Sequence, residues 1–432
     1  MSNLLVVKEF DKIINSNNKK SWMKCHSLPN DTFEDLKRFI EEFKEDETAD
    51  VLEFMRISYQ RDYGEVITVR NYVGLIEMKD GTQIEILPKI SYEEEGHSIS
   101  KNIFIKMLRS LRDFSGKVFN SASLNIDKMT LYEVFINMYL QEVRQLIKKG
   151  VKSFYEKKEE NLRVYKGKIV IKEQLRNNFI HKERFHVEYD DYTSNRPENR
   201  LIKSTLLKLQ KESKHVKNKT EIRNLLNHFE YIEQSKNYDN DFNKVVITRE
   251  NKEYETLVNW SKVLLYDKSF TAFSGSTIAK AIMFPMEKLF ESYISSEIKK
   301  VTRFNNWSVS TQDRGLYLFD SPEKFSLRPD IVIRKNETQR IVLDTKWKIL
   351  IDNERRNYGV TSSDMYQMYA YAKKYNAQKV FVLYPMSPEM ERYQEYISFS
   401  SKDNVNISLV LIDLINIENS METLYRSLKQ ID

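Results

Sequence analysis

Two stretches decide the fold of the last third of this 432-residue chain: Arg328-Pro329-Asp330-Ile331-Val332-Ile333 and Ile341-Val342-Leu343-Asp344-Thr345-Lys346. Each contains a run of three apolar residues beside charged ones. The polar residues between them predict a tight antiparallel hairpin centred near Glu337. Asp344 and Lys346 are two residues apart on a strand, so their side chains share a face. The hairpin brings Asp330 opposite Asp344, and two carboxylates and an ammonium group should therefore converge at one edge.

This convergence predicts a metal-dependent catalytic site. Two neighbouring carboxylates repel each other, and a hard divalent cation such as Mg²⁺ relieves that repulsion. We expect Asp330 and Asp344 to be catalytic metal ligands, with the carbonyl of Thr345 as a further ligand, for one or two Mg²⁺ ions. Lys346 would orient the attacking water. A bound cation would acidify water and neutralise charge on a phosphate.

The spacing alone is weak evidence, because Asp35-Leu36-Lys37 has the same pattern on an expected helix. Paired charges at strand ends are often ordinary surface salt bridges. The preceding Pro-Asp, the apolar arms of the hairpin and the helix that follows favour the catalytic interpretation.

The helix expected at 364–374, with Asp364 as its cap, adds further polar groups near the hairpin. Gln367 and Tyr371 are four residues apart and lie on one helix face. We expect both to contact the substrate, although packing of this tyrosine-rich helix on the sheet would explain Tyr371 equally well. Arg328 and Lys348 are candidates for contacts with phosphates, the alternative being ordinary surface charge.

Three regions differ in character along the chain. Residues 1–100 combine a helix with strands and predict an N-terminal, β-rich α/β domain. Residues 101–270 are lysine-rich and predict a mainly helical middle region, with a short strand near 166–171. Residues 271–432 alternate helices and strands and predict a mixed sheet flanked by helices. The fold class expected is thus a multidomain α/β (α+β) protein.

Composition excludes several kinds of protein. The chain has one cysteine, Cys25, so it has no internal disulfide and no cysteine-based zinc or iron–sulfur site. All six histidines precede the third region, which excludes a histidine-dependent centre there. No Walker A motif occurs, so we expect no nucleotide to be bound by this chain alone. No signal peptide and no apolar stretch of about 18 residues is found, so we expect a cytoplasmic protein without a membrane partner.

The pattern RPD-x13-DTK followed by Gln367-Met368-Tyr369-Ala370-Tyr371 resembles the PD-(D/E)xK nuclease superfamily. Glu291, on the helix before the hairpin, matches the acidic residue that often joins the metal site in these folds. Further segments resemble McrC-type subunits of McrBC restriction systems. They are Asn71–Ile76, Ile86–Ile90, Lys166–Ile169, Glu188–Tyr192 with Asn199-Arg200, and Pro285-Met286 with Leu289–Glu291.

The resemblance implies a Mg²⁺-dependent endonuclease subunit of a GTP-dependent, modification-dependent restriction system in phage defence. It implies a hexameric AAA+ GTPase partner of McrB type, docked by the N-terminal region and stimulated by it, and a double-stranded, modified DNA substrate. Two alternatives remain open: a non-catalytic adaptor of the GTPase ring, and a stand-alone nuclease of the recombination-repair type. The modification, the recognition sequence, the cut position and the stoichiometry are not encoded in any motif.

Overall fold

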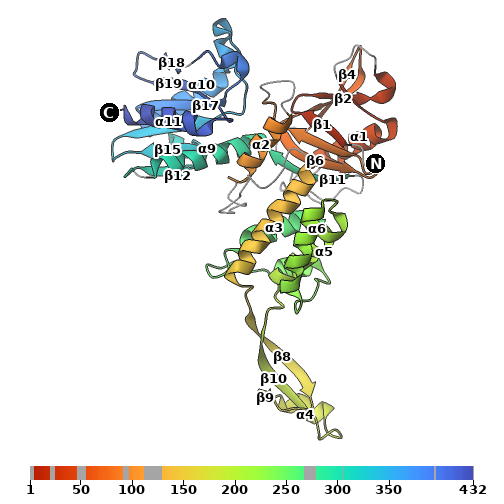
Figure 1. Ribbon diagram of the computed structural model, residues 1–432. Helices are drawn as coiled ribbons and strands as arrows, with labels where there is room; N and C mark the ends of the chain where they lie inside the picture. The colour runs from red at the N-terminus through yellow and green to blue at the C-terminus, as the bar shows by residue number, and fades with distance from the viewer. Residues whose placement is uncertain are drawn as a thin grey trace. The chain divides into compact units, whose positions relative to one another are not determined.

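The computed structural model describes residues 4–19, 25–45, 55–90, 97–110, 129–266, 279–303, 305–393 and 396–431. The backbone divides into two compact units (Figure 1). Unit 1 contains Met1–Ser115, Leu124–Lys128 and Ser269–Asp432, and unit 2 contains Gly116–Ser123 and Met129–Lys268. The chain thus leaves unit 1, forms unit 2 and returns.

Two four-stranded sheets form the N-terminal part of unit 1. The first sheet has the order β1 (Leu4–Lys8), β7 (Gln83–Leu87), β6 (Tyr72–Met78), β11 (Ala279–Pro285). The second has the order β3 (His26–Leu28), β2 (Lys12–Asn15), β5 (Gly64–Val69), β4 (Met55–Gln60). Helices α1 (Asn30–Glu45) and α2 (His97–Leu108) accompany them.

The hairpin of β6 and β7 turns at Asp80-Gly81, a residue pair that favours tight turns. Gly81 adopts a positive φ, and the amide of Met78 donates to the carbonyl of Thr82 at 2.8 Å. All five residues of β7 are buried, because the strand lies between β1 and β6. This central strand anchors the N-terminal core.

The region after the boundary expected near residue 270 shares unit 1 with the N-terminal region, and the chain changes unit between Lys268 and Ser269. Strand β11 pairs antiparallel with β6 from Ala279↔Met78 to Pro285↔Tyr72, so the first strand of the third region completes the N-terminal sheet. A pairing between segments so distant along the chain leaves no local sequence signal.

The C-terminal part of unit 1 is a six-stranded mixed sheet with helices, as predicted. Its order is β12 (Ser308–Thr311), β15 (Ile331–Arg334), β16 (Arg340–Thr345), β17 (Lys379–Pro385), β19 (Asn406–Ile412), β18 (Ile397–Ser400). The helices are α9 (Met286–Thr302), α10 (Ser362–Tyr375) and α11 (Ile417–Lys429), and a separate hairpin joins β13 (Tyr317–Asp320) to β14 (Glu323–Ser326). The central strands are apolar and almost wholly buried, as expected for a sheet covered on both faces.

Helix α10 begins earlier than predicted. Its N-cap is Thr361, whose hydroxyl accepts from the amide of Asp364, so Asp364 lies inside the first turn. The prediction of Asp364 as the cap was therefore wrong. A threonine hydroxyl reaches the free amide of the third helical residue, which satisfies the helix end.

Unit 2 contains the expected helices together with a β-arm. The helices are α3 (Leu131–Lys149), α5 (Pro197–Glu212), α6 (Val216–Leu226), α7 (Tyr238–Lys244) and α8 (Tyr254–Tyr266). The arm consists of β8 (Phe154–Leu162), β9 (Lys168–Ile169), α4 (Ile171–Asn177) and β10 (Phe185–Thr193). Short 3-10 helices lie at Ser16–Asn18, Asn227–Phe229, Glu354–Gly359 and Pro388–Met390.

The β-arm was predicted only as a short strand near 166–171, and the long pairing of β8 with β10 was missed. The segment Phe154–Leu162 is FYEKKEENL, with five charged residues, so no apolar face marks it as a strand. It forms because its backbone pairs with β10 residue by residue, from Thr193↔Phe154 to Phe185↔Leu162.

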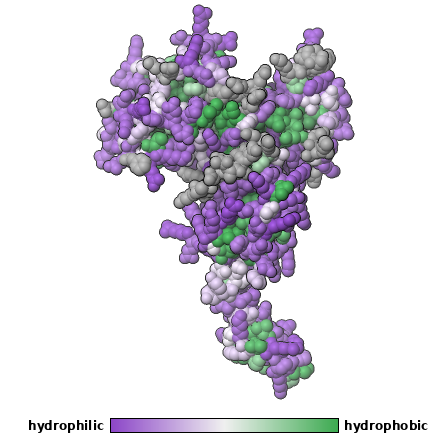
Figure 2. All heavy atoms as spheres, in the orientation of Figure 1, coloured by the Kyte–Doolittle hydropathy of each residue, from purple (hydrophilic) through white to green (hydrophobic). Residues whose placement is uncertain are grey.

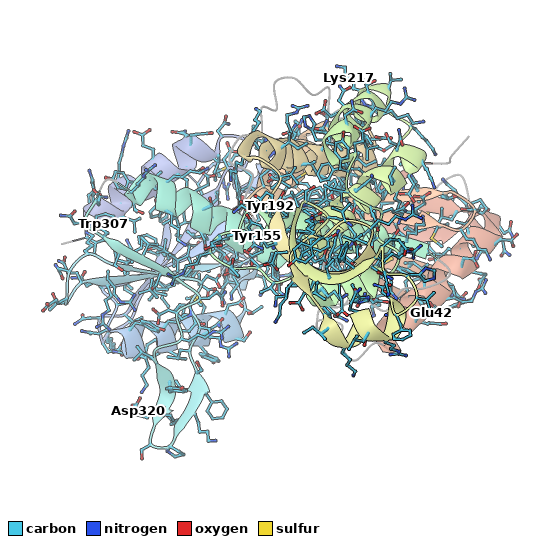
Figure 3. The ribbon with its side chains drawn as sticks, turned by 90° about the horizontal axis from the view of Figure 1, so that it is seen from below. Glu42, Tyr155, Tyr192, Lys217, Trp307 and Asp320 are labelled. Carbon is cyan, nitrogen blue, oxygen red and sulfur yellow. The ribbon has the colours of Figure 1, made fainter. Side chains whose placement is uncertain are left out.

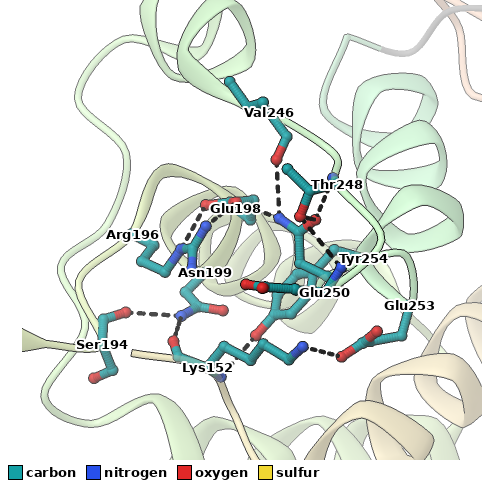
Figure 4. A network of polar contacts seen from close by, with 11 residues as sticks. Lys152, Ser194, Arg196, Glu198, Asn199, Val246, Thr248, Glu250, Glu253 and Tyr254 are labelled. Atoms are coloured by element: carbon teal, nitrogen blue, oxygen red, sulfur yellow. Dashed lines mark hydrogen bonds and ion pairs between the residues drawn. The ribbon is translucent and has the colours of Figure 1, made fainter. Parts of the chain in front are cut away.

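The base of the arm is closed by a buried polar network (Figure 4). Asn199, fully buried on α5, donates to the carbonyls of Lys152 and Ser194 at 3.0 and 2.8 Å. Tyr254 accepts from the amide of Lys152 at 3.0 Å, and Glu198 pairs with Arg196 at 2.9 Å. Both chain ends of the arm are therefore fixed to α5.

The far end of the arm exposes apolar side chains (Figure 2). They are Val164, Tyr165, Ile171, Leu175, Phe179 and Ile180. Nearer the base, the exposed rings of Tyr155 and Tyr192 pack together with centroids 4.9 Å apart (Figure 3). Within the described segments, no helix has the length and apolar character needed to traverse a lipid bilayer.

Candidate functional site

The predicted hairpin places Asp330 and Asp344 at the same end of two neighbouring strands. Strand β15 pairs with β16 from Ile331↔Leu343 to Arg334↔Arg340, and the amide of Lys335 closes the turn onto the carbonyl of Gln339 at 3.0 Å. Asp330 immediately precedes β15. Its Oδ2 accepts from the amide and the hydroxyl of Thr345 at 2.7 and 2.6 Å. The backbone next to Asp344 is therefore tied to Asp330.

Asp344 is a buried carboxylate on β16 that pairs with Lys346, the first residue beyond the end of that strand. It is 2% exposed, and its Oδ2 lies 2.8 Å from Nζ of Lys346. No hydrogen bond of acceptable geometry reaches this Oδ2 from the part of the chain that the structure describes. Lys346 can neutralise only one of the two carboxylates at this end of the hairpin, and a buried carboxylate left without a compensating cation is costly.

The electrostatics of the three groups are mutually dependent. Burial raises the pKa of Asp344, the nearby Asp330 carboxylate raises it further, and Lys346 opposes both effects. Burial also raises the pKa of Asp330, against the hydrogen bonds from Thr345. Burial lowers the pKa of Lys346, but Asp344 and Asp330 outweigh it and hold the pKa above its ordinary value. The site therefore keeps the lysine charged and favours added positive charge beside the carboxylates.

Glu291 joins the cluster through a residue that the sequence analysis did not identify. Gln312 follows β12 with a positive φ of 52°, and its amide nitrogen donates to Glu291 at 2.5 Å and to Asp330 at 3.4 Å. The backbone amide of Gln312 also donates to the carbonyl of Asp330 at 2.9 Å. No local sequence pattern marks Gln312, because it reaches the cluster through the pairing of β12 with β15.

Gln367 lies beside the lysine, whereas Tyr371 faces the core. Nζ of Lys346 donates to Oε1 of Gln367 at 3.2 Å, and Nε2 of Gln367 donates to the hydroxyl of Tyr371 at 2.8 Å. Tyr371 is 2% exposed. Its ring packs in the core between α10 and the sheet, which is the alternative that the tyrosine-rich helix left open, and contact of Tyr371 with substrate stays a prediction. Its hydroxyl orients Gln367.

The two predicted phosphate-contacting residues have different surroundings. Arg328 is exposed. Lys348 is half-buried and pairs with Asp364 at 2.7 Å, so part of its charge is already compensated. Neither residue contacts the acidic cluster through an interaction found in the described residues.

The residues present fit a Mg²⁺ ion on chemical grounds. Among the residues that the structure describes, no group of three or more His, Cys, Asp or Glu side chains is arranged to hold a metal ion. Mg²⁺ does not require such a group, because it is commonly held by one or two carboxylates and keeps several waters. Oδ2 of Asp344, lacking a hydrogen bond, and the adjoining Asp330 supply that donor set.

Comparison with known proteins gives a family and a fold. The family described as "McrBC 5-methylcytosine restriction system component" matches residues 67–385. A solved assembly described as Thermococcus gammatolerans McrB AAA+ hexamers with bound McrC matches with a TM-score of 0.69 and 19% identity, over 100% of both chains. A second chain, from the McrBC complex of the same organism, matches at a TM-score of 0.49 and 20% identity, over 69% of this chain and 88% of that one. No curated protein sequence matches.

Proposed function

Because this chain belongs to the McrBC family of restriction-system components, as a McrC-type subunit, we propose that it is the endonuclease subunit, hydrolysing DNA phosphodiesters with Mg²⁺. The observation that supports this most directly is the junction of Asp330, Asp344 and Lys346 at one end of the β15–β16 hairpin. We propose that this is the arrangement of the PD-(D/E)xK nucleases, with aspartate at the second acidic position.

In the proposed reaction the residues of the chain have separate tasks. Mg²⁺ held by Asp330 and Asp344, with Glu291 and the carbonyl of Thr345 as further ligands, would supply Lewis-acid stabilisation of the phosphate and a more acidic water. Lys346 holds the attacking water and balances the carboxylates. Gln367, oriented by Tyr371, fixes the ammonium group of Lys346. Arg328 and Lys348 bind DNA phosphates near the hairpin.

The proposed partner is an AAA+ GTPase of McrB type, as in the solved assembly. This chain has no Walker A motif, so nucleotide hydrolysis would take place on the partner. We propose residues 1–100 and the apolar end of the β-arm as docking surfaces. Large exposed apolar patches of this kind mark protein interaction sites. The DNA would be double-stranded and carry the modification that the partner recognises.

The decisive experiment reconstitutes the chain with its partner, GTP, Mg²⁺ and methylated DNA. Asp344→Asn should abolish cleavage while stimulation of the partner's GTPase is retained. The matched control is Glu422→Gln, at an exposed carboxylate on α11 that pairs with Arg426, which should cleave at the wild-type rate.

Three outcomes would contradict the proposal. Cleavage by the Asp344→Asn variant at the wild-type rate would remove this site from the reaction. GTPase stimulation by the wild-type chain without any cleavage would favour a non-catalytic adaptor. Efficient cleavage of DNA ends without partner or GTP would favour a stand-alone nuclease.

A further inference from the structure

Trp347, the residue after Lys346, links the candidate site to the N-terminal sheet. Its Nε1 donates to both carboxylate oxygens of Glu9, at 2.9 and 3.2 Å. Glu9 directly follows β1, and both side chains are buried, at 3% and 4% exposed. A segment at the start of the chain therefore contacts the residue beside the proposed catalytic lysine.

Lys89 closes the same contact from the other side. Its Nζ donates to the carbonyl of Trp347 at 2.8 Å, and its backbone amide donates to Oε2 of Glu9 at 3.1 Å. The Nζ also lies 5.4 Å from the centroid of the Trp347 ring. Thus the indole N–H and the backbone carbonyl of Trp347 are each held by a charged side chain from the N-terminal sheet.

The indole also contacts the helix that carries Glu291. Its ring centroid lies 5.3 Å from that of Phe290, the residue before Glu291 on α9. Helix α9 in turn follows β11 without a break, and the amide of Met286 donates to the carbonyl of Asn71 in the N-terminal part at 2.9 Å. Both Lys346 and Glu291 therefore neighbour residues whose positions depend on the N-terminal sheet.

The stability of the fold alone does not require charged side chains such as Glu9 and Lys89 at this contact. A buried carboxylate carries a desolvation penalty, and well-packed apolar residues of similar volume often replace buried ionic groups without loss of stability. Directed hydrogen bonds do what apolar packing does not: they fix the rotation of the indole and the direction of its carbonyl. The backbone from Lys346 to Lys348 thereby has one defined path.

We propose that Glu9 and Lys89 are positioning residues for Lys346, acting through Trp347, so that the N-terminal sheet sets the geometry of the nuclease site. This inference rests on the proposed function. It goes beyond that function because it assigns part of the cleavage rate to residues on the N-terminal sheet. A partner bound to that sheet would then influence cleavage by moving Glu9 and Lys89 relative to the hairpin.

The test uses the full chain with its partner, GTP, Mg²⁺ and methylated DNA, in single-turnover cleavage. The main variant is the double substitution Glu9→Met with Lys89→Met, which keeps side-chain volume and leaves no unpaired buried charge. We expect its rate constant at saturating DNA to fall by about tenfold to about a hundredfold, as small misplacements of catalytic groups do. DNA affinity and the thermal unfolding midpoint should stay close to wild type.

Two further variants separate positioning from packing. Trp347→Phe keeps a ring against Phe290 but removes the N–H, and should also slow cleavage. Glu9→Gln keeps an oxygen that can accept from Trp347, and should recover most of the rate lost in the double variant. Trp307→Phe is the matched control at the opposite end of the same sheet, where a half-buried indole packs on Tyr425, and should cleave normally.

The inference is overturned if the double variant and Trp347→Phe both cleave at the wild-type rate, or if their rates fall only in proportion to lost stability. The Asp344→Asn variant separates failure of the positioning role from failure of the proposed function. If Asp344→Asn still cleaves, the proposed function itself fails. If Asp344→Asn is inactive but the Glu9 and Trp347 variants are normal, only the positioning role fails.

Discussion

At the scale of single residues, the candidate site shows a conflict between stability and function. Asp344 is buried beside Asp330, and the repulsion between them is only partly offset by Lys346. Functional sites commonly retain such unfavourable charges because the reaction needs them. Because of this conflict, neutralising one carboxylate should increase the stability of the fold.

We expect Asp344→Asn to raise the free energy of unfolding by about 1 kcal/mol in metal-free buffer near neutral pH, because it removes a buried charge whose pKa the fold raises. Thermal unfolding with EDTA measures this change. Added Mg²⁺ should raise the unfolding midpoint of the wild type but not of the variant. A variant less stable than wild type in EDTA would contradict the repulsion argument.

Asp313 shows the opposite behaviour and gives a prediction for pH. Burial acts to raise its pKa, but Arg334 at 2.7 Å, the amide of Gly315, and the hydroxyls of Ser310 and Tyr375 together lower it to about 2. A carboxyl with a lowered folded-state pKa stabilises the fold above its unfolded pKa, and the contribution is lost as pH falls through the folded pKa.

Asp313→Asn should therefore destabilise the chain at pH 6 by about 1 kcal/mol, after allowing for solvent screening of an ion pair whose arginine is partly exposed. The difference from wild type should shrink between about pH 4 and about pH 2. Urea unfolding across this pH range tests it, and a difference that does not change with pH would show that Asp313 acts by packing alone.

At the scale of elements, the pairing of β6 with β11 depends on one glycine. Gly74 has a φ of 141°, and a Cβ there would lie 2.0 Å from the carbonyl oxygen of Ile282. The backbone of Ile282 could move away from such a Cβ only if β6 and β11 separated. Gly81, in the β6–β7 turn, also has a positive φ, but a Cβ there meets nothing within 4 Å.

Gly74→Ala should therefore lower the free energy of unfolding by about 3 kcal/mol or more, whereas Gly81→Ala should cost about 1 kcal/mol, the strain of the left-handed conformation alone. Denaturant unfolding of both variants gives the comparison. Equal losses would mean that β6 and β11 can separate without cost.

The apolar end of the β-arm yields a prediction about the partner. Phe179 and Ile180 are 77% and 83% exposed, so replacing both with serine should leave folding stability almost unchanged. Stimulation of the partner's GTPase should fall by about tenfold if the patch is a docking surface. Tyr231→Ser, at an isolated residue of unit 2 that is 89% exposed, is the control. Unchanged stimulation in the double variant would leave residues 1–100 as the proposed docking surface.

The elements that the sequence predicted well are those with local signals. The hairpin from Arg328 to Lys346 combines apolar runs with a polar turn, so its register and the meeting of Asp330 with Asp344 followed directly. Gln312 and the contact of Glu9 with Trp347 had no such signal, because each joins segments far apart along the chain. Tyr371 is buried because its face of α10 meets the sheet. The spacing of Gln367 and Tyr371 shows that they share a helix face but not whether that face meets the sheet or the substrate.

At the scale of the whole molecule, the order of segments along the chain does not follow the order of compact units. Unit 1 is assembled from both ends of the sequence, and unit 2 is inserted between them. Within unit 1 the two ends are joined by the seven-residue ladder of β6 with β11 and by the hydrogen bonds of Glu9 and Lys89 to Trp347. The N-terminal sheet and the C-terminal sheet should therefore depend on each other for folding.

We expect residues 4–110 and 279–431, produced as separate polypeptides, to associate when expressed together, because the β6–β11 pairing buries most of β11 and leaves an unsatisfied strand edge on either fragment alone. Co-elution in size-exclusion chromatography and one cooperative unfolding transition for the mixture measure this. Gly74→Ala in the first fragment should abolish association, since its Cβ would meet β11 directly. A C-terminal fragment that unfolds cooperatively on its own, with the midpoint of the mixture, would show instead that the C-terminal sheet is an autonomous domain and that the N-terminal sheet contributes nothing to its stability.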